Sequence, residues 1–114
     1  MQKTLLAHSS DGATAYEVNF LFDDGGLVIF CSCSAGEFGK LCKHKLALLR
    51  GDRGMLFDAE QEGLLKEVEG WIGTTGYPDL LKELDRAESQ YQTAKTRIDK
   101  LKKQLERLMK GNLT

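Results

Sequence analysis

The chain has 114 residues, of which 41% are hydrophobic and 29% charged, and its 16 basic and 17 acidic side chains leave a net charge of −1. This length suits one small domain, alone or with an extension, and a net charge so close to zero excludes bulk electrostatics as a guide to the partner. No apolar run approaches the length of a membrane helix, and the N-terminus lacks the pattern of a signal peptide. We therefore expect a cytoplasmic protein with no membrane partner.

The first part of the chain carries strand signals. A short apolar run, Thr4–His8, ends in a cluster of turn residues, and apolar side chains then alternate with polar ones over Tyr16–Phe22. The sequence Asp-Asp-Gly-Gly at 23–26 tolerates the positive φ of a tight turn and joins that strand to Leu27–Cys33 as a hairpin. These signals predict a three-stranded antiparallel meander. His8 matches no ligand spacing, so we expect it to be a surface or strand-end histidine.

All three cysteines and one of the two histidines follow the meander in the pattern C-x-C, eight residues, C-x-H: Cys31, Cys33, Cys42 and His44. Three thiolates and an imidazole are the ligand set of a closed, four-coordinate structural zinc (Zn2+) site. The alternatives are three buried free thiols, a disulfide that leaves one thiol over, or a catalytic cysteine, for which no base stands out. The matched spacing of the histidine favours structural zinc.

This stretch resembles the SWIM-type zinc finger, whose signature is C-x-C, a variable gap and C-x-H. In that family two strands lead into the first ligand pair and a helix begins at or just after the second. Here Tyr16–Phe22 and Leu27–Cys33 precede the first pair, and Lys45–Leu49 follows the second. The likeness covers roughly residues 13–50. One departure is Ser34, which stands where the family often has proline.

Two helices are predicted after the second ligand pair. The first spans about Cys42–Arg50 and ends at Gly51, and its Leu46 and Leu49 share the face that should pack on the hairpin. The second, Ala59–Ile72, starts at a capping-box pattern of Asp58 with Gln61. Its apolar residues recur at helical spacing: Leu64, Leu65, Val68, Trp71 and Ile72.

A third helix, Pro78–Lys110, begins with a proline suited to a first turn and ends before Gly111. The spacing between its successive apolar residues is four and three in turn, which is the heptad period of a coiled coil. The a positions are Leu84, Tyr91, Ile98 and Leu105, and the d positions are Leu80, Ala87, Ala94, Leu101 and Leu108. This pattern predicts a homodimer through the helix.

The charges beside the seam favour an antiparallel pair, with Leu84 beside Leu108 and Tyr91 beside Leu101, since a parallel pair brings like charges together. The competing arrangement is a hairpin inside one chain. Residues 51–79 carry two basic and seven acidic side chains, residues 80–114 carry nine and five, and the two segments attract.

Together these elements predict an α+β fold: a zinc-bound meander with a helix, then an acidic helix, then the long helix. We expect a SWIM-like zinc-binding domain at 1–54, a connecting acidic helix and hinge at 55–76, and an amphipathic helix at 77–114.

For function, the resemblance implies a module that binds nucleic acid (DNA) or a protein partner. No nucleophile, acid–base pair or phosphate loop stands out, so we expect an adaptor or accessory protein and not an enzyme. The alternative is a module for protein–protein interaction and dimerisation alone. The run of basic residues near the C-terminus leaves nucleic acid open.

Overall fold

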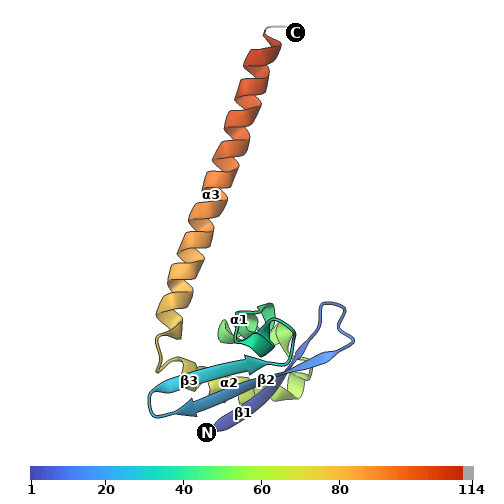
Figure 1. Cartoon of the computed structure of the whole chain (residues 1–114), viewed down its shortest axis with the longest axis vertical. Coiled ribbons are helices and arrows are strands. Elements are labelled where there is room, and N and C mark those ends of the chain that lie inside the picture. Colours follow the sequence, from blue (N-terminus) through green and yellow to red (C-terminus); the bar gives the residue numbers. More distant parts are fainter. Residues whose placement is uncertain (112–114) are drawn as a thin grey trace. The chain divides into compact units, whose positions relative to one another are not determined.

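The computed structural model of the protein describes residues 1–111 and has the predicted α+β fold. Three antiparallel strands lie side by side in the order β1-β2-β3 (Figure 1). The strands are β1 Gln2–His8, β2 Ala15–Asp23 and β3 Gly26–Cys31. The α-helices are α1 Lys43–Leu49, α2 Glu62–Ile72 and α3 Tyr77–Lys110. Short 3-10 turns lie at Gly36–Phe38, Arg53–Met55 and Ala59–Gln61.

The chain divides into two compact units, Met1–Pro78 and a second unit that begins at Asp79. The first unit holds the sheet, α1 and α2, and the second consists of α3. The finer division into 1–54, 55–76 and 77–114 stays a prediction.

The core of the first unit lies on one face of the sheet. Leu5, Val18 and Cys31 face one another across the three strands, and all three are buried. Since α1 contacts β3, α2 contacts β1 and the two helices contact each other, this face is the covered one. The alternate residues Val28 and Phe30 are exposed, as the period of a strand with one covered face requires.

The hairpin turn is the predicted one. Asp23 pairs with Gly26, and the two residues between them close the turn, with Gly25 at φ 89°. This left-handed conformation is costly for a residue with a side chain and free for glycine.

Helix α1 begins and ends as its sequence indicates, but it buries a different face. Gly51, at φ 74°, donates to the carbonyl of Leu48, and the next amide donates to Ala47, so the helix closes with a Schellman motif. Leu46 is only half-buried, whereas Lys45, Leu48 and Leu49 are buried. The predicted pairing of Leu46 with Leu49 is therefore wrong in one residue, because the aliphatic stem of Lys45 fills the inner face.

Helix α2 begins after a 3-10 turn and not with the predicted capping box. The Asp58 carboxylate caps that turn by accepting from the Glu60 amide at 3.0 Å. Gln61 instead accepts a hydrogen bond from the Leu6 amide at 2.8 Å and so ties α2 to the edge of β1. The buried face of the helix consists of Leu65, Val68 and Ile72.

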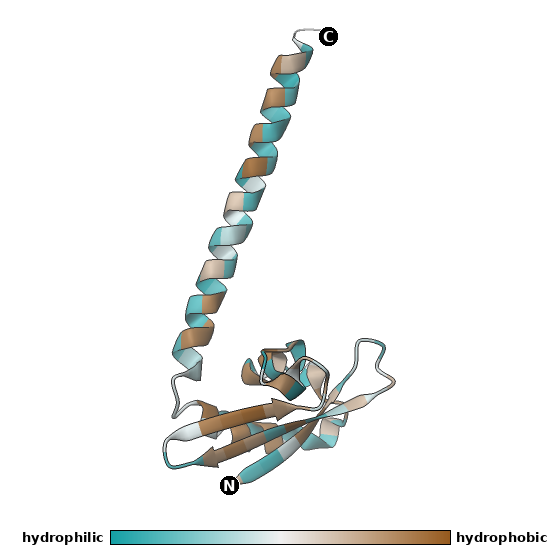
Figure 2. Cartoon of the chain, in the orientation of Figure 1, coloured by the Kyte–Doolittle hydropathy of each residue, from teal (hydrophilic) through white to brown (hydrophobic). Residues whose placement is uncertain are grey.

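Helix α3 has 34 residues and buries none of them. Brown segments recur along it between teal ones, which is the seam of apolar residues that the heptads predict (Figure 2). Within residues 1–111, no helix has both the length and the apolar composition of a bilayer span.

Candidate metal centre

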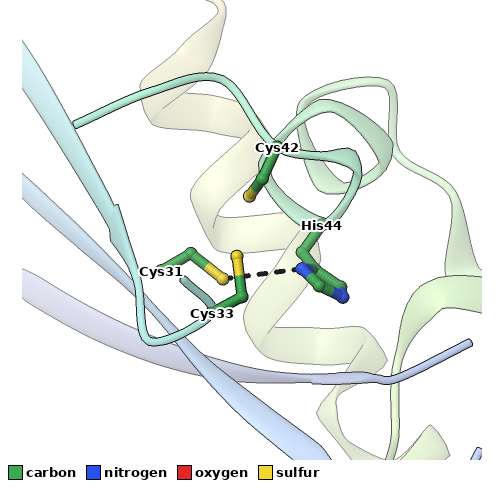
Figure 3. A group of neighbouring side chains, drawn as sticks. All are labelled: Cys31, Cys33, Cys42 and His44. Carbon is green, nitrogen blue, oxygen red and sulfur yellow. Dashed lines mark hydrogen bonds between the residues drawn. The ribbon is translucent and has the colours of Figure 1, made fainter. Parts of the chain in front are cut away.

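The four predicted ligands come together in the first unit. The donor atoms of Cys31, Cys33, Cys42 and His44 all lie within 4.8 Å of one another, and all four residues are buried. Figure 3 shows the three sulfur atoms and the imidazole turned toward a common point. Donors about 2.0–2.3 Å from a tetrahedral ion are themselves less than about 4 Å apart, so the cluster is close to the geometry of a bound metal.

The first ligand pair is fixed by β2. Cys31 is the last residue of β3 and pairs with Val18. Ser32 then donates from its amide to the Glu17 carbonyl at 2.9 Å, and its hydroxyl accepts from the Glu17 amide at 2.9 Å. Because Ser32 is bonded through both groups, the backbone between the two cysteines is held in place.

A tight turn after Cys33 supplies hydrogen-bond donors to that residue. The Gly36 amide donates to the Cys33 sulfur at 3.3 Å, and the Glu37 amide donates to the Cys33 carbonyl at 3.0 Å. A Cβ atom at position 36 would lie 2.4 Å from the Cβ of Cys31. Glycine is therefore required here by the close approach of the turn to the first ligand.

The second pair stands at the beginning of α1. Cys42 is the N-cap residue, and its sulfur accepts from the Lys45 amide at 3.4 Å. His44 lies in the first turn, and its Nδ1 is 3.7 Å from the Cys31 sulfur (Figure 3). The backbone amide that points at Cys33 favours its thiolate over the thiol, since it donates to the charged form.

Lys45 has a structural role that the sequence pattern does not predict. Its ammonium is buried and donates to the carbonyls of Gly36 at 3.3 Å and Lys40 at 3.0 Å. These carbonyls belong to the loop that joins the two ligand pairs, so Lys45 ties that loop to α1. The only sequence signal was its position three residues after Cys42, on the ligand side of the helix.

Burial and neighbouring groups shift the pKa values of three of the four metal-free ligand residues. Burial raises the pKa of the Cys31 thiol to about 12, and the neighbouring Cys42 adds to this effect. Burial also acts to raise the pKa of Cys33, but the Gly36 amide and the adjacent thiols outweigh it and lower the pKa. The pKa of His44 is lowered by burial and then by the positive charges of Lys43 and His8. A neutral imidazole is the form that binds a metal.

The His44 ring packs beside Tyr16, with the ring centroids 4.9 Å apart. Its Nε2 is buried and has no hydrogen-bond partner among residues 1–111. A metal-bound histidine often donates its second N–H to a neighbour. An open hollow of about 650 Å³ lies beside the cluster and is bordered by Tyr16, Cys33 and His44.

The donor set fits a metal ion. Three free cysteines, none of them in a disulfide, and one imidazole with a lowered pKa are arranged around one point. Thiolate and imidazole ligands in a set of four suit zinc, which prefers tetrahedral nitrogen and sulfur coordination. The cluster indicates a metal-binding site.

His8, the other histidine, lies away from this cluster, in β1. Its Nδ1 bonds to the Ser9 carbonyl at 2.9 Å and its Nε2 to the Gly54 carbonyl at 2.6 Å. These carbonyls raise the pKa of His8, because they favour the protonated ring. The residue is a strand-end histidine that bonds to backbone.

Comparison with known proteins agrees with this site. The family model of the SWIM zinc finger matches residues 16–50, which include both strands of the hairpin, all four ligands and α1. No curated protein and no solved structure matches the chain. The matched segment is less than half of the chain, and within it the resemblance to the SWIM zinc finger is confirmed.

Proposed function

We propose that this protein is a non-catalytic interaction module in which a structural zinc ion holds a binding surface in shape, so that it works as an adaptor or accessory factor. One observation carries the proposal: the four buried donors come from the end of β3, the loop after it and the start of α1. A metal bound by all four would join those segments. Four protein ligands also complete a tetrahedral set, which is the pattern of structural zinc and not of catalytic zinc.

Zinc content is the first test of this function. Purified full-length protein is expected to hold close to one zinc ion per chain, measured by elemental analysis, and a chelator should release it together with the fold of the first unit. A protein whose amide hydrogen exchange stays the same after metal removal would overturn the structural role.

The surface that this site supports is the loop between the ligand pairs. Phe38 is 81% exposed and Leu41 60% exposed, although both are large apolar residues. Lys40 and Lys43 lie beside them and are exposed too. Exposed apolar residues on a rigid loop suit a protein partner, since burial of such side chains supplies most of the binding energy at interfaces.

Nucleic acid is the second candidate partner, and a specific feature favours it. An exposed aromatic ring followed by lysines, as Phe38 is followed by Lys40 and Lys43, can stack on a base while the lysines contact phosphate. The exposed second half of α3 adds a run of basic residues: Lys95, Arg97, Lys100, Lys102, Lys103, Arg107 and Lys110.

A binding series separates the two candidates. Zinc-loaded protein is titrated with labelled single-stranded and duplex DNA and RNA at rising salt concentration. A nucleic-acid binder is expected to lose affinity with a slope of about −0.7 to −0.9 per phosphate contact in a logarithmic plot. Phe38→Ala should weaken binding to single strands by about tenfold, because stacking is worth ~1–3 kcal/mol per base.

The matched control is Phe57→Ala, which removes another exposed phenylalanine of the first unit, outside the zinc loop. Absence of binding at physiological salt would exclude nucleic acid and leave the protein partner as the function. For either partner we place the protein in the cytoplasm, where thiol ligands remain reduced.

A further inference from the structure

Helix α3 presents an apolar seam that nothing within the described chain buries. Among the heptad residues, Leu80 is 65% exposed, Tyr91 68% and Ile98 51%, and Leu101, Leu105 and Leu108 are exposed as well. The apolar face of α2 does not provide a cover, because Leu65, Val68 and Ile72 are already buried inside the first unit. A long amphipathic helix in water requires another apolar surface against its stripe.

We infer that the seam binds the same seam of a second copy of this chain, in antiparallel orientation, with Leu84 of one copy opposite Leu101 of the other. In this register Leu80 lies opposite Leu105, Tyr91 opposite Ala94 and Ile98 opposite Ala87. The inference does not depend on the zinc site or on the partner class proposed above.

The sizes of the seam residues carry the first argument. From Leu80 to Leu105 the d positions run large, small, small, large, and the a positions are all large. An antiparallel pair places a opposite d, so in this register each alanine receives a Tyr or an Ile and each end is closed by two leucines. A parallel pair instead stacks alanine on alanine and tyrosine on tyrosine, which leaves a gap and a bulge. The pattern is self-complementary, as a twofold interface requires.

The charges carry the second argument. In the proposed register the flanking e positions bring Glu88 of each copy to Lys95 of the other, and the twofold axis repeats this attraction. The g positions bring Glu83 to Gln104 and Gln90 to Arg97, so no like charges meet at these positions.

The competing arrangements each bring like charges together. In a parallel pair Glu83 faces Glu88 and Arg97 faces Lys102. One heptad away, with Leu84 opposite Leu108, Lys95 meets Lys95 of the other copy and Arg97 meets Arg97. With Leu84 opposite Ala94, Glu88 meets Glu88. The register expected from the sequence, with Leu84 beside Leu108, is therefore replaced by the neighbouring one.

Light scattering of the full-length protein at micromolar concentration gives the first test. The expected mass is twice the 12.7 kDa of one chain, and it should fall toward one chain on dilution. Ile98→Asp places a charge in the seam and should give a monomer. Thr96→Asp, two residues away on the outer side of the helix, should leave the dimer intact. A monomeric wild-type protein, or a larger assembly, would overturn the proposal.

Charge reversal tests the register even where Ile98→Asp unfolds the helix. Glu88→Lys brings two lysines together at both ends of the repeated contact and should weaken the dimer by about tenfold. Lys95→Glu should weaken it to a similar extent, and the double variant Glu88→Lys/Lys95→Glu should restore the wild-type dissociation constant. A parallel dimer gives the opposite sign for Glu88→Lys, because that change removes the repulsion from Glu83. Tighter dimerisation by Glu88→Lys therefore contradicts the proposal.

The dimer and the zinc site can be tested apart. A Cys33→Ser variant that has lost its metal should still associate through α3. Association that disappears with the metal would place the contact in the first unit and overturn the role of the seam.

Discussion

The two units of this chain hold their structure by opposite means. In the first unit residues far apart in sequence meet: Gln61 bonds to Leu6, and the four ligand residues come from two segments on either side of a loop. In α3 the backbone hydrogen bonds are those of a helix, between residues close in sequence, and no residue of the helix is buried. The structure of the first unit is defined by its buried core and its cluster of ligand residues. Helix α3 leaves its apolar seam uncovered, so its tertiary contacts depend on another surface.

This difference shows that two parts of one chain can be stable for unrelated reasons. A sheet of three strands and two short helices buries little apolar surface, so a metal held by the four ligand residues would add to its stability. A helix of 34 residues is long enough to form by itself in part, and its packing is left for association. Changes in one unit should therefore leave the other nearly unaffected.

The largest expected effect is the loss of a metal ligand. Cys33→Ser should release the metal and unfold the first unit, because structural zinc contributes on the order of 10 kcal/mol to such small folds. The helical far-ultraviolet circular dichroism of α3 should remain. Elemental analysis measures the bound metal, and amide hydrogen exchange measures the protection of each unit separately. Ser34→Ala, at an exposed neighbouring position, serves as the control. Loss of α3 together with the metal would contradict the independence of the units.

Acid should break the first unit next. The metal-bound cluster carries fewer protons than the free cluster, in which the Cys31 thiol has a pKa of about 12, so a fall in pH favours release. The affinity for zinc should fall by about two to three orders of magnitude per pH unit, since up to three thiols take up protons. His44, whose pKa is lowered, adds a further proton only below the ordinary range of histidine. Competition with a coloured chelator between pH 6 and 8 gives the slope, and a flat profile would show that thiolates are not the ligands.

A single methyl group should distinguish two glycines of the first unit. Gly36→Ala forces a Cβ atom against Cys31 and should cost about 3 kcal/mol, along with most of the bound metal. The same substitution at Gly70, in α2, meets nothing within 4 Å and should stabilise the unit by about 0.5–1 kcal/mol. Thermal unfolding of the zinc-loaded variants measures both, and equal effects at the two positions would contradict the close approach of the turn.

The buried ammonium gives a smaller effect. Lys45→Met keeps the aliphatic stem but leaves the carbonyls of Gly36 and Lys40 without this donor, which should cost about 2 kcal/mol. Zinc should then be lost to a chelator more readily. Lys40→Met, at an exposed lysine of the same loop, should change neither quantity. If both variants behave like the wild type, the loop is held by the metal alone.

The smallest effect concerns α3. Lys103→Gly introduces glycine at an outward position of the helix and should cost about 0.7 kcal/mol of local helix stability. The far-ultraviolet circular dichroism of the helix should weaken, while the zinc content and the pH dependence of the zinc affinity stay the same. A change in zinc content would show that the two units depend on each other.

Much of the fold follows from the sequence because its signals are local. Alternating residues predicted the meander, Gly25 and Gly51 marked a turn and a helix end, and the heptads predicted α3 almost to the residue. The ligand cluster followed from residue type and spacing, since few other arrangements use three cysteines and a histidine in that order.

The remaining details depend on the packing in three dimensions. Gln61 could have closed a capping box, but the β1 edge offers the Leu6 amide as a better-placed donor. Lysine is rarely buried, so residue type alone does not predict a buried Lys45, and only the carbonyls of the folded loop provide acceptors for its ammonium. The need for glycine at position 36 appears only when the turn lies against Cys31.

One aromatic contact in the first unit has a practical consequence. Trp71 stacks on Phe22 with the ring centroids 5.5 Å apart, and it is the one tryptophan of the chain. Tryptophan emission therefore reports on the first unit alone, whereas most of the helical far-ultraviolet circular dichroism comes from α3, the longest α-helix in residues 1–111. An unlabelled sample can therefore be followed by two signals. Tryptophan emission reports unfolding of the metal-binding unit, and far-ultraviolet circular dichroism reports melting of the helix.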